Sequence, residues 1–330
     1  MYNREKEYRA IISALGGTLL LFLLLFHTVY GGVVSVQNIL IRQFASSDVV
    51  YIISELFCSC VYILIFVLPV MFFYGITKGV KNHPMDLTLK MPKHRPLFSY
   101  VAIIFSGLAV VIVMAYVNQR VVPVPPSVSF ELFKSIDNTK AYVYALGFLG
   151  SAVVPAFSEE LLFRGLIVSN IKPYSRKGAV VISALAFGLM HQNPIQVIYA
   201  TAAGAVLALI YLKTESIWCC IALHFVNNFV SVAQSIAVSL FGEEEVRTIL
   251  MWCDVATVAV GILFGVALLL ISLKPKKQKS IWYAEHFNKE DKNISSGRFC
   301  LETLFNPTIC IFVVLCIAVT VLKGMEIYNM

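Results

Sequence analysis

Runs of about 20 apolar residues recur along the whole of this 330-residue chain. An α-helix needs about that length to cross the roughly 30 Å hydrocarbon core of a bilayer, and it satisfies its own backbone hydrogen bonds there. The pattern predicts an all-α fold, a polytopic transmembrane helical bundle with eight or nine membrane spans. Val33–Asp48 is amphipathic, and we expect it to be a re-entrant or surface piece. The candidate spans are Ala10–Tyr30, Val49–Ile76, Phe98–Val117, Tyr142–Ile171, Gly178–His191, Ile195–Leu212, Ile217–Phe241, Asp254–Leu273 and Pro307–Leu322.

The composition indicates the same class of protein. Hydrophobic residues make up 58% of the chain and charged residues 14%, whereas soluble domains average about 45–50% and about 25%. This balance argues against a soluble enzyme, a nucleic-acid-binding protein and a disordered scaffold. We therefore expect the lipid bilayer as a partner and no nucleic acid. Seven of the eight cysteines lie within or at the ends of apolar segments, where cysteine is usually a small hydrophobe, so no disulfide framework is expected.

Basic residues are distributed unevenly between the two sides of the predicted bundle. Alternating spans place 19 Lys and Arg residues on the side of the N-terminus and 6 on the opposite side. Because cytoplasmic loops carry this excess, we predict a multi-pass plasma-membrane protein with a cytoplasmic N-terminus. We expect three parts: N-terminal membrane helices at 1–140 with a basic cytoplasmic loop at 77–97, a membrane core at 141–241, and C-terminal helices at 242–330 with a basic cytoplasmic tail at 274–305.

Three charged side chains lie within six residues of one predicted span, in the segment Ser158–Gly165. A charge inside the bilayer costs at least about 2.5–3.5 kcal/mol and calls for a reason. His191 and His224 fall on two later spans. At 1.5 Å per residue, Glu159, His191 and His224 lie roughly 18, 20 and 17 Å from the cytoplasmic ends of their helices. One carboxylate and two imidazoles are therefore expected at one depth in the membrane.

The spacing within these helices suggests separate roles for the polar residues. Glu160 and Arg164 stand four residues apart on one helix face, which favours an ion pair that neutralises a buried charge. Glu159 points about 100° away from Glu160 and has no partner in its own helix, so it can face another cavity. His224 and Asn228 are also four residues apart and can face one site. A carboxylate beside a neutral histidine can activate a shared water molecule as a general base.

These residues resemble the three motifs of the CPBP intramembrane endopeptidases, the family of CaaX-processing proteases and bacteriocin-processing or Abi-type membrane proteins. The resemblance covers roughly residues 153 to 229, the central part of the membrane core at 141–241. Three motifs in order on separate membrane helices are far more specific than any one of them. The motifs are Glu159-Glu160-x-x-x-Arg164, Phe187-x-x-x-His191 and His224-x-x-x-Asn228.

The resemblance implies a membrane endopeptidase and a role for each motif. Glu159 would activate a water molecule with help from His191, and His224 with Asn228 would stabilise the oxyanion of the tetrahedral intermediate. The acid–base pair of the first motif, Glu160 with Arg164, would hold that motif in shape. The implied substrate is a membrane-associated peptide or protein; whether it is a prenylated CaaX protein stays open.

The cofactor is left open between two alternatives. Glu159, His191 and His224 could make a three-ligand zinc site with an open position for water. Metal-independent activation of water by glutamate is favoured, because the common zinc-protease motifs with paired histidines around a glutamate are absent. Asn228, on the same helix face as His224, also suits an oxyanion donor better than a metal ligand.

Two other kinds of function remain as alternatives. In a proton-coupled transporter, the same buried acid and histidines would form a proton relay, although no internal repeat of the transporter type is visible. A non-catalytic bacteriocin-immunity or partner-binding membrane protein would keep the motifs as a structural cluster. Substitution of Glu159 by glutamine distinguishes these classes, because only a protease would lose peptide cleavage while the fold is retained.

Overall fold

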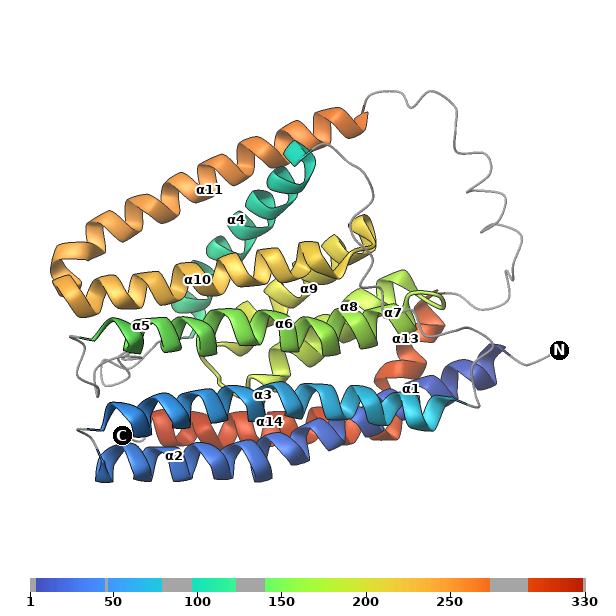
Figure 1. Ribbon diagram of the computed structural model, residues 1–330. Helices are drawn as coiled ribbons and strands as arrows, with labels where there is room; N and C mark the ends of the chain where they lie inside the picture. The colour runs from blue at the N-terminus through green and yellow to red at the C-terminus, as the bar shows by residue number, and fades with distance from the viewer. Residues whose placement is uncertain (1–3, 45–46, 79–96, 123–139, 274–295, 329–330) are drawn as a thin grey trace.

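The computed structural model describes residues 4–44, 47–78, 97–122, 140–273 and 296–328. Every regular element in these ranges is a helix, so the all-α prediction is confirmed. Figure 1 shows the start of α1 at one end of the bundle and the end of α14 at the other. The elements, with π-helices labelled η, are α1 (Arg4–Leu25), η1 (Phe26–Tyr30), α2 (Gly31–Gln43), α3 (Asp48–Thr77), α4 (Leu97–Val121), α5 (Ala141–Phe148), η2 (Leu149–Val153), α6 (Val154–Glu160), η3 (Leu161–Val168), α7 (Ser169–Ile171), α8 (Arg176–Met190), α9 (Val197–Thr214), α10 (Ile217–Phe241), α11 (Glu243–Leu273), α13 (Ser296–Leu304) and α14 (Pro307–Tyr328).

The described residues contain eight helical segments that are long and apolar enough to cross a membrane. The protein is therefore an integral membrane protein, as the sequence predicts. The shorter helix α8, of 15 residues, passes through the bundle beside them. The eight segments are Glu5–Gln43, Asp48–Thr77, Phe98–Val121, Ala141–Ile171, Val197–Thr214, Ile217–Phe241, Glu244–Ile271 and Pro307–Ile327.

The first membrane helix is longer than the sequence suggests. Helix α1 continues through η1 into α2, so one helical segment runs from Glu5 to Gln43. The expectation of a re-entrant piece at Val33–Asp48 is therefore wrong, because residues up to Gln43 continue the first helix. The backbone of Gly31 keeps right-handed helical angles (φ −58°, ψ −41°), so the chain changes its apolar face through the wider π-helical turns without leaving the helix.

Helices α8 and α9 approach each other closely because small residues line their contact. A Cβ atom added to Gly188 would lie 1.9 Å from Oγ1 of Thr201, and one added to Gly204 would lie 3.1 Å from the Ala184 Cα. Membrane helices associate through such small residues, because lipid provides little hydrophobic drive between them. The close approach holds the first turns of α9 against the end of α8 that precedes His191.

The chain reverses inside the bundle between α8 and α9. Gln192 has a left-handed backbone (φ 48°) and a fully buried side chain, directly after His191. The side-chain amide of Asn118, on α4, donates a hydrogen bond to the carbonyl of Ile195 in this turn. Irregular backbone at membrane depth is tolerated where it is buried in protein. Helix α4 thus helps to hold the turn that follows His191.

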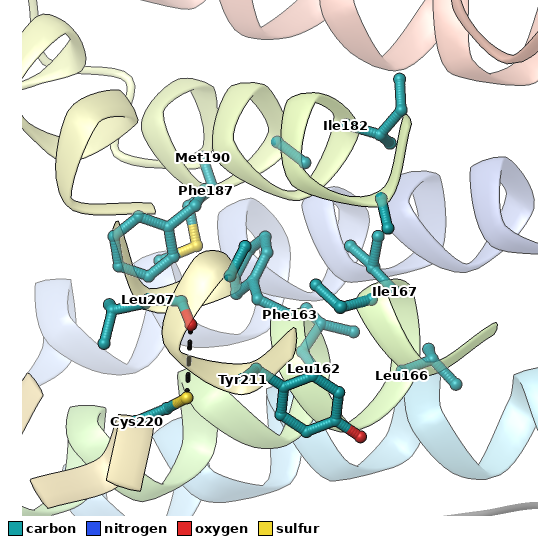
Figure 2. Packing of buried hydrophobic residues seen from close by; sticks show 14 of the residues in the cluster. Leu162, Phe163, Leu166, Ile167, Ile182, Phe187, Met190, Leu207, Tyr211 and Cys220 are labelled. Atoms are coloured by element: carbon teal, nitrogen blue, oxygen red, sulfur yellow. Dashed lines mark hydrogen bonds between the residues drawn. The ribbon is translucent and has the colours of Figure 1, made fainter. Parts of the chain in front are cut away.

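Buried apolar side chains pack together where η3, α8, α9 and α10 meet. Figure 2 shows the Phe163 and Phe187 rings of η3 and α8 close to one another, with ring centroids 5.1 Å apart and nearly perpendicular planes. The Cys220 thiol of α10 lies 3.3 Å from the carbonyl oxygen of Leu207 on α9 and donates to it. The helices that carry the polar motifs are therefore fixed against one another by one continuous apolar core.

Helix α11 lies at the periphery of the bundle and packs mainly on α4 (Figure 1). A Cβ atom at Gly261 would lie 2.4 Å from the Ala109 Cβ, and the hydroxyl of Ser106 donates to the Gly261 carbonyl at 3.2 Å. The predicted basic loop at 77–97 lies almost wholly outside the described residues, as does the 274–295 part of the predicted basic tail. Residues 296–304 of that tail form α13.

Candidate active site

Glu159 and Glu160 end helix α6, and the π-helix η3 begins at the next residue. Glu160 and Arg164 are fully buried, and Glu159 is 5% exposed. π-Helical turns are rare and occur often at functional sites. Glu159, Glu160 and Arg164 are thus buried on one continuous helix, which changes from α-helical to π-helical geometry directly after Glu160.

Arg164 neutralises Glu160 in the interior. Its Nη1 lies 2.8 Å from Oε1 of Glu160, and its Nη2 donates to the carbonyl oxygen of Gly204 at 3.0 Å. The guanidinium also lies over the Phe187 ring, 4.6 Å from the centroid, in a cation–π contact. Further hydrogen bonds, to the Gly204 carbonyl and from His224, help a buried pair of this kind to be tolerated. Oε2 of Glu160 and Nε of Arg164 have no hydrogen-bond partner among the described residues. The spacing of four residues predicts this ion pair.

His224, on α10, lies between the two glutamates. Its Nδ1 is 2.8 Å from Oε1 of Glu160, and its Nε2 is 3.8 Å from Oε2 of Glu159. Because a carboxylate only accepts hydrogen bonds, Nδ1 carries the proton in this contact.

Glu159 uses one carboxylate oxygen and leaves the other unpaired. The hydroxyl of Tyr62, on α3, donates to its Oε1 at 2.7 Å. Its Oε2 is buried and has no hydrogen-bond partner in the part of the chain that the structure describes. A separation of 3.8 Å from the His224 Nε2 is too long for a direct hydrogen bond and suits a bridging water. The unpaired oxygen makes Glu159 the acceptor that can take a proton from such a water.

His191 lies just past the end of α8, and its backbone hydrogen bond fixes its tautomer. The ring Nδ1 is 2.8 Å from the carbonyl oxygen of Phe187, which can only accept, so Nδ1 is the donor. In the neutral ring, Nε2 then keeps its lone pair. The Phe187 ring contacts both imidazoles edge-on, with centroids 5.2 Å from His191 and 5.7 Å from His224.

Asn228 follows His224 by one helical turn, and its amide is oriented by its neighbour. The Nδ2 group of Asn227 donates to Oδ1 of Asn228 at 3.2 Å. That contact places the donor end of the Asn228 amide, its Nδ2 group, away from the Asn227 donor. Asn228 therefore presents an N–H donor of the type that stabilises an oxyanion.

The structure gathers Glu159, Glu160, Arg164 and His224 into one network of contacts. The hydrogen bond of the His191 ring goes to Phe187 and not to Glu159. Across the described residues, no group of three His, Cys, Asp or Glu side chains is arranged to hold a metal ion. Glu159, His191 and His224 do not fit the zinc site that the sequence left open.

Two further residues contribute to this network: Tyr62, which does not stand out in the sequence, and Phe187, whose contacts the motif does not reveal. Tyr62 lies on α3, far from the motif segment, and only its position in the middle of an apolar run hints at a role, because a buried tyrosine hydroxyl usually needs a partner. Phe187, the first residue of the second motif, provides both the acceptor for His191 and the ring against Arg164. Its aromatic character alone is typical of a core residue.

The fold and the site define a polytopic membrane protein with a buried Glu-Glu-Arg-His network. Residues 141–230 match a family model described as Type II CAAX prenyl endopeptidase Rce1-like. This segment thus carries a domain of the CAAX protease, or CPBP, family, and the resemblance seen in the motifs is confirmed. The family is one of intramembrane endopeptidases. No curated protein and no solved structure matches the chain. Tyr62 lies outside the matched segment.

Proposed function

We propose that the protein is an intramembrane endopeptidase that hydrolyses a peptide bond through a water molecule activated by Glu159. The observation that carries this proposal is the unpaired, buried Oε2 of Glu159, which faces Nε2 of His224 at 3.8 Å. A buried acceptor without a partner is costly. A reacting water molecule would supply the partner that Oε2 of Glu159 lacks.

In the proposed reaction Oε2 of Glu159 takes a proton from water as the water oxygen attacks the carbonyl carbon of the peptide. The same carboxyl group then gives the proton to the leaving nitrogen as the C–N bond breaks. The products are a new carboxyl end and a new amino end. In this scheme His191 offers the lone pair of its Nε2 to the water, because its Nδ1 proton is held by Phe187.

The oxyanion of the tetrahedral intermediate needs donors that are already in place. In our proposal these donors are Nε2–H of the protonated His224 and the Nδ2 group of Asn228. Glu160 supports the protonated state of His224 by accepting from Nδ1 at 2.8 Å. Arg164 balances the charge of Glu160, so the network stays neutral before water is deprotonated.

The proposed substrate is a membrane-associated peptide or membrane-protein end whose scissile bond lies near the membrane. The family match supports this class, and a prenylated CaaX protein is one member of it. The excess of basic residues on the N-terminal side supports a cytoplasmic N-terminus in the plasma membrane. Water activation by glutamate without a metal is part of the proposal.

The test is quantitative peptidomics of new peptide ends in membranes that contain the wild-type protein or Glu159→Gln at equal expression. Glu326→Gln is the matched control, because it makes the same chemical change at an exposed position on α14. We expect new ends with the wild type and Glu326→Gln and none with Glu159→Gln. Those ends would also identify the substrate class.

Identical peptide ends in all three samples would count against the protease if repetition in a reconstituted, substrate-supplemented system gave the same result. Altered solute flux in Glu159→Gln without cleavage would then favour the proton-coupled transporter. If Glu159→Gln still protected cells against a bacteriocin, and neither solute flux nor cleavage were seen, the result would favour the non-catalytic immunity protein.

A further inference from the structure

A tyrosine from outside the family-matched segment reaches the carboxylate of Glu159. Tyr62 lies near the middle of α3, and its hydroxyl donates to Oε1 of Glu159 at 2.7 Å. The free hydroxyl ordinarily loses its proton only near pH 10, so it is the donor to a carboxylate. Helix α3 therefore completes a site whose other members all come from residues 141–230.

We propose that Tyr62 is a positioning residue that holds the Glu159 carboxylate through Oε1 and reserves its Oε2 for the reaction. This inference rests on the proposed function, because it assigns Tyr62 a role through the Glu159 carboxylate. The hydrogen bond engages Oε1, whereas Oε2 has no partner among the described residues. The two oxygens of the Glu159 carboxylate therefore differ, because one accepts a hydrogen bond and the other is free to bind a reacting water.

The ring of Tyr62 is held so that the hydroxyl has one direction. The Tyr30 ring, at the end of η1, packs edge-on against it with centroids 5.2 Å apart. The Phe66 ring, one turn further along α3, lies 5.0 Å away on the same helix. Rings packed in this way exclude water and restrict rotation about the side-chain bonds. Tyr62 thus reaches Glu159 from a preorganised position, as a group that supports a reacting residue must.

The hydrogen bond has a direct consequence for the chemistry. Burial disfavours a charged carboxylate, whereas a donor to the charged form favours it. Arg164 does not fill this role, because its guanidinium bonds to Glu160 and to the Gly204 carbonyl. Tyr62 is the side chain that donates to Glu159 within the described ranges, so it supports the carboxylate that accepts a proton from water in the proposed reaction.

The first arm of the test observes the Glu159 carboxyl group without any substrate. Infrared difference spectra of wild type minus Glu159→Gln isolate the bands of this group, and the same subtraction is made in a Tyr62→Phe background. We expect the carboxylate stretching bands to shift in frequency, because Oε1 loses its hydrogen-bond donor. Unchanged bands would overturn the proposal.

The second arm measures cleavage of a peptide that carries the sequence found by the peptidomics experiment. Tyr62→Phe should lower kcat roughly tenfold to a hundredfold with little change in KM, the range for losing a hydrogen bond to a charged group. Tyr116→Phe is the matched control, because it removes a tyrosine hydroxyl that donates to the Asp254 carboxylate at an exposed site.

Fluorinated tyrosines at position 62 separate a positioning role from a structural one. They keep the ring and grade the acidity of the hydroxyl, so kcat should change with acidity while the protein stays folded. A flat response, or a Tyr62→Phe enzyme within twofold of the wild type, would overturn the inference. Absence of cleavage by the wild type itself would instead count against the proposed function, and the infrared arm would still decide whether Tyr62 controls Glu159.

Discussion

Nδ1 of His224 and Nη1 of Arg164 both lie 2.8 Å from the same atom, Oε1 of Glu160. One carboxylate oxygen therefore joins helix α10 to the π-helix η3. Glu160 is more than the partner of Arg164 in an ion pair, because it also orients the His224 imidazole, whose Nε2 lies 3.8 Å from Oε2 of Glu159.

Replacing Arg164 tests how far this network stabilises the fold. Arg164→Met leaves the buried network with one negative charge that no cation balances, so the free energy of unfolding should fall by about 3–5 kcal/mol. The double variant Glu160→Gln, Arg164→Met should be more stable than Arg164→Met alone, because it no longer buries an unpaired charge. Unfolding by SDS titration in mixed micelles, followed by fluorescence, measures both.

Arg298→Met serves as the control for that comparison. Arg298 lies in an exposed ion-pair cluster with Glu5 and Glu302, where a pair is worth at most about 1 kcal/mol. An Arg164→Met protein no less stable than Arg298→Met would contradict the charge-balanced network.

The two neighbouring asparagines should differ in their effect on the reaction. Asn228→Ala removes a proposed oxyanion donor and should lower kcat by about a hundredfold to a thousandfold, with KM nearly unchanged. Asn227→Ala frees the amide of Asn228 to turn and removes a hydrogen bond with Tyr199, but no proposed donor, and should cost less than about tenfold. Steady-state kinetics on the identified peptide decide this order, and the reverse order would exclude the assigned role of Asn228.

The contact between α8 and α9 should tolerate no added methyl group. In Gly188→Ala the new Cβ would lie 1.9 Å from Oγ1 and 2.9 Å from the backbone nitrogen of Thr201. Moving that side chain does not relieve the backbone contact, so we expect a loss of about 1–3 kcal/mol in stability. Cleavage should also fall, because His191 follows three residues later.

Gly17→Ala is the matched control, since a Cβ there meets nothing within 4 Å. In the interior of α1 the change should raise stability by roughly 0.5–1 kcal/mol. Thermal unfolding of the two variants measures the difference. Equal melting temperatures for both alanine variants would show that α8 can move away from α9 without penalty.

Removal of metal ions should leave peptide cleavage intact. The described residues hold no group of three ligands arranged for a metal, and Glu159 is instead bound by a tyrosine hydroxyl. Exhaustive treatment with a strong zinc chelator, followed by dialysis and assay, tests this. Loss of cleavage that added zinc restores would replace the proposed mechanism with a metal-dependent one.

Much of the fold follows from the sequence because lipid imposes a strict length on apolar helices. The runs that end at Ile76, Ile171 and Phe241 become membrane helices within a few residues of their predicted bounds. The ion pair of Glu160 and Arg164 also follows, since residues four apart on a helix face each other.

Other features depend on contacts between distant segments and leave little trace in the sequence. A tyrosine inside an apolar run looks like any core residue, so the bond from Tyr62 to Glu159 could not be predicted. The depth estimate put His191 level with Glu159, but the ring hydrogen bond goes to Phe187 because α8 ends there. The sequence does not predict the continuous first helix, because nothing at Phe26–Tyr30 marks the π-helical turn that joins its two parts.

The hydrogen bond from Asn118 to the Ile195 carbonyl crosses the boundary of the recognised domain. A residue of α4, outside the matched segment, thereby supports the turn that bears His191. The segment 141–230 is consequently not an independent unit that could be transferred alone to another protein. A chimera that contains this segment would also need the contacting residues of the flanking helices, including the side chain at position 118.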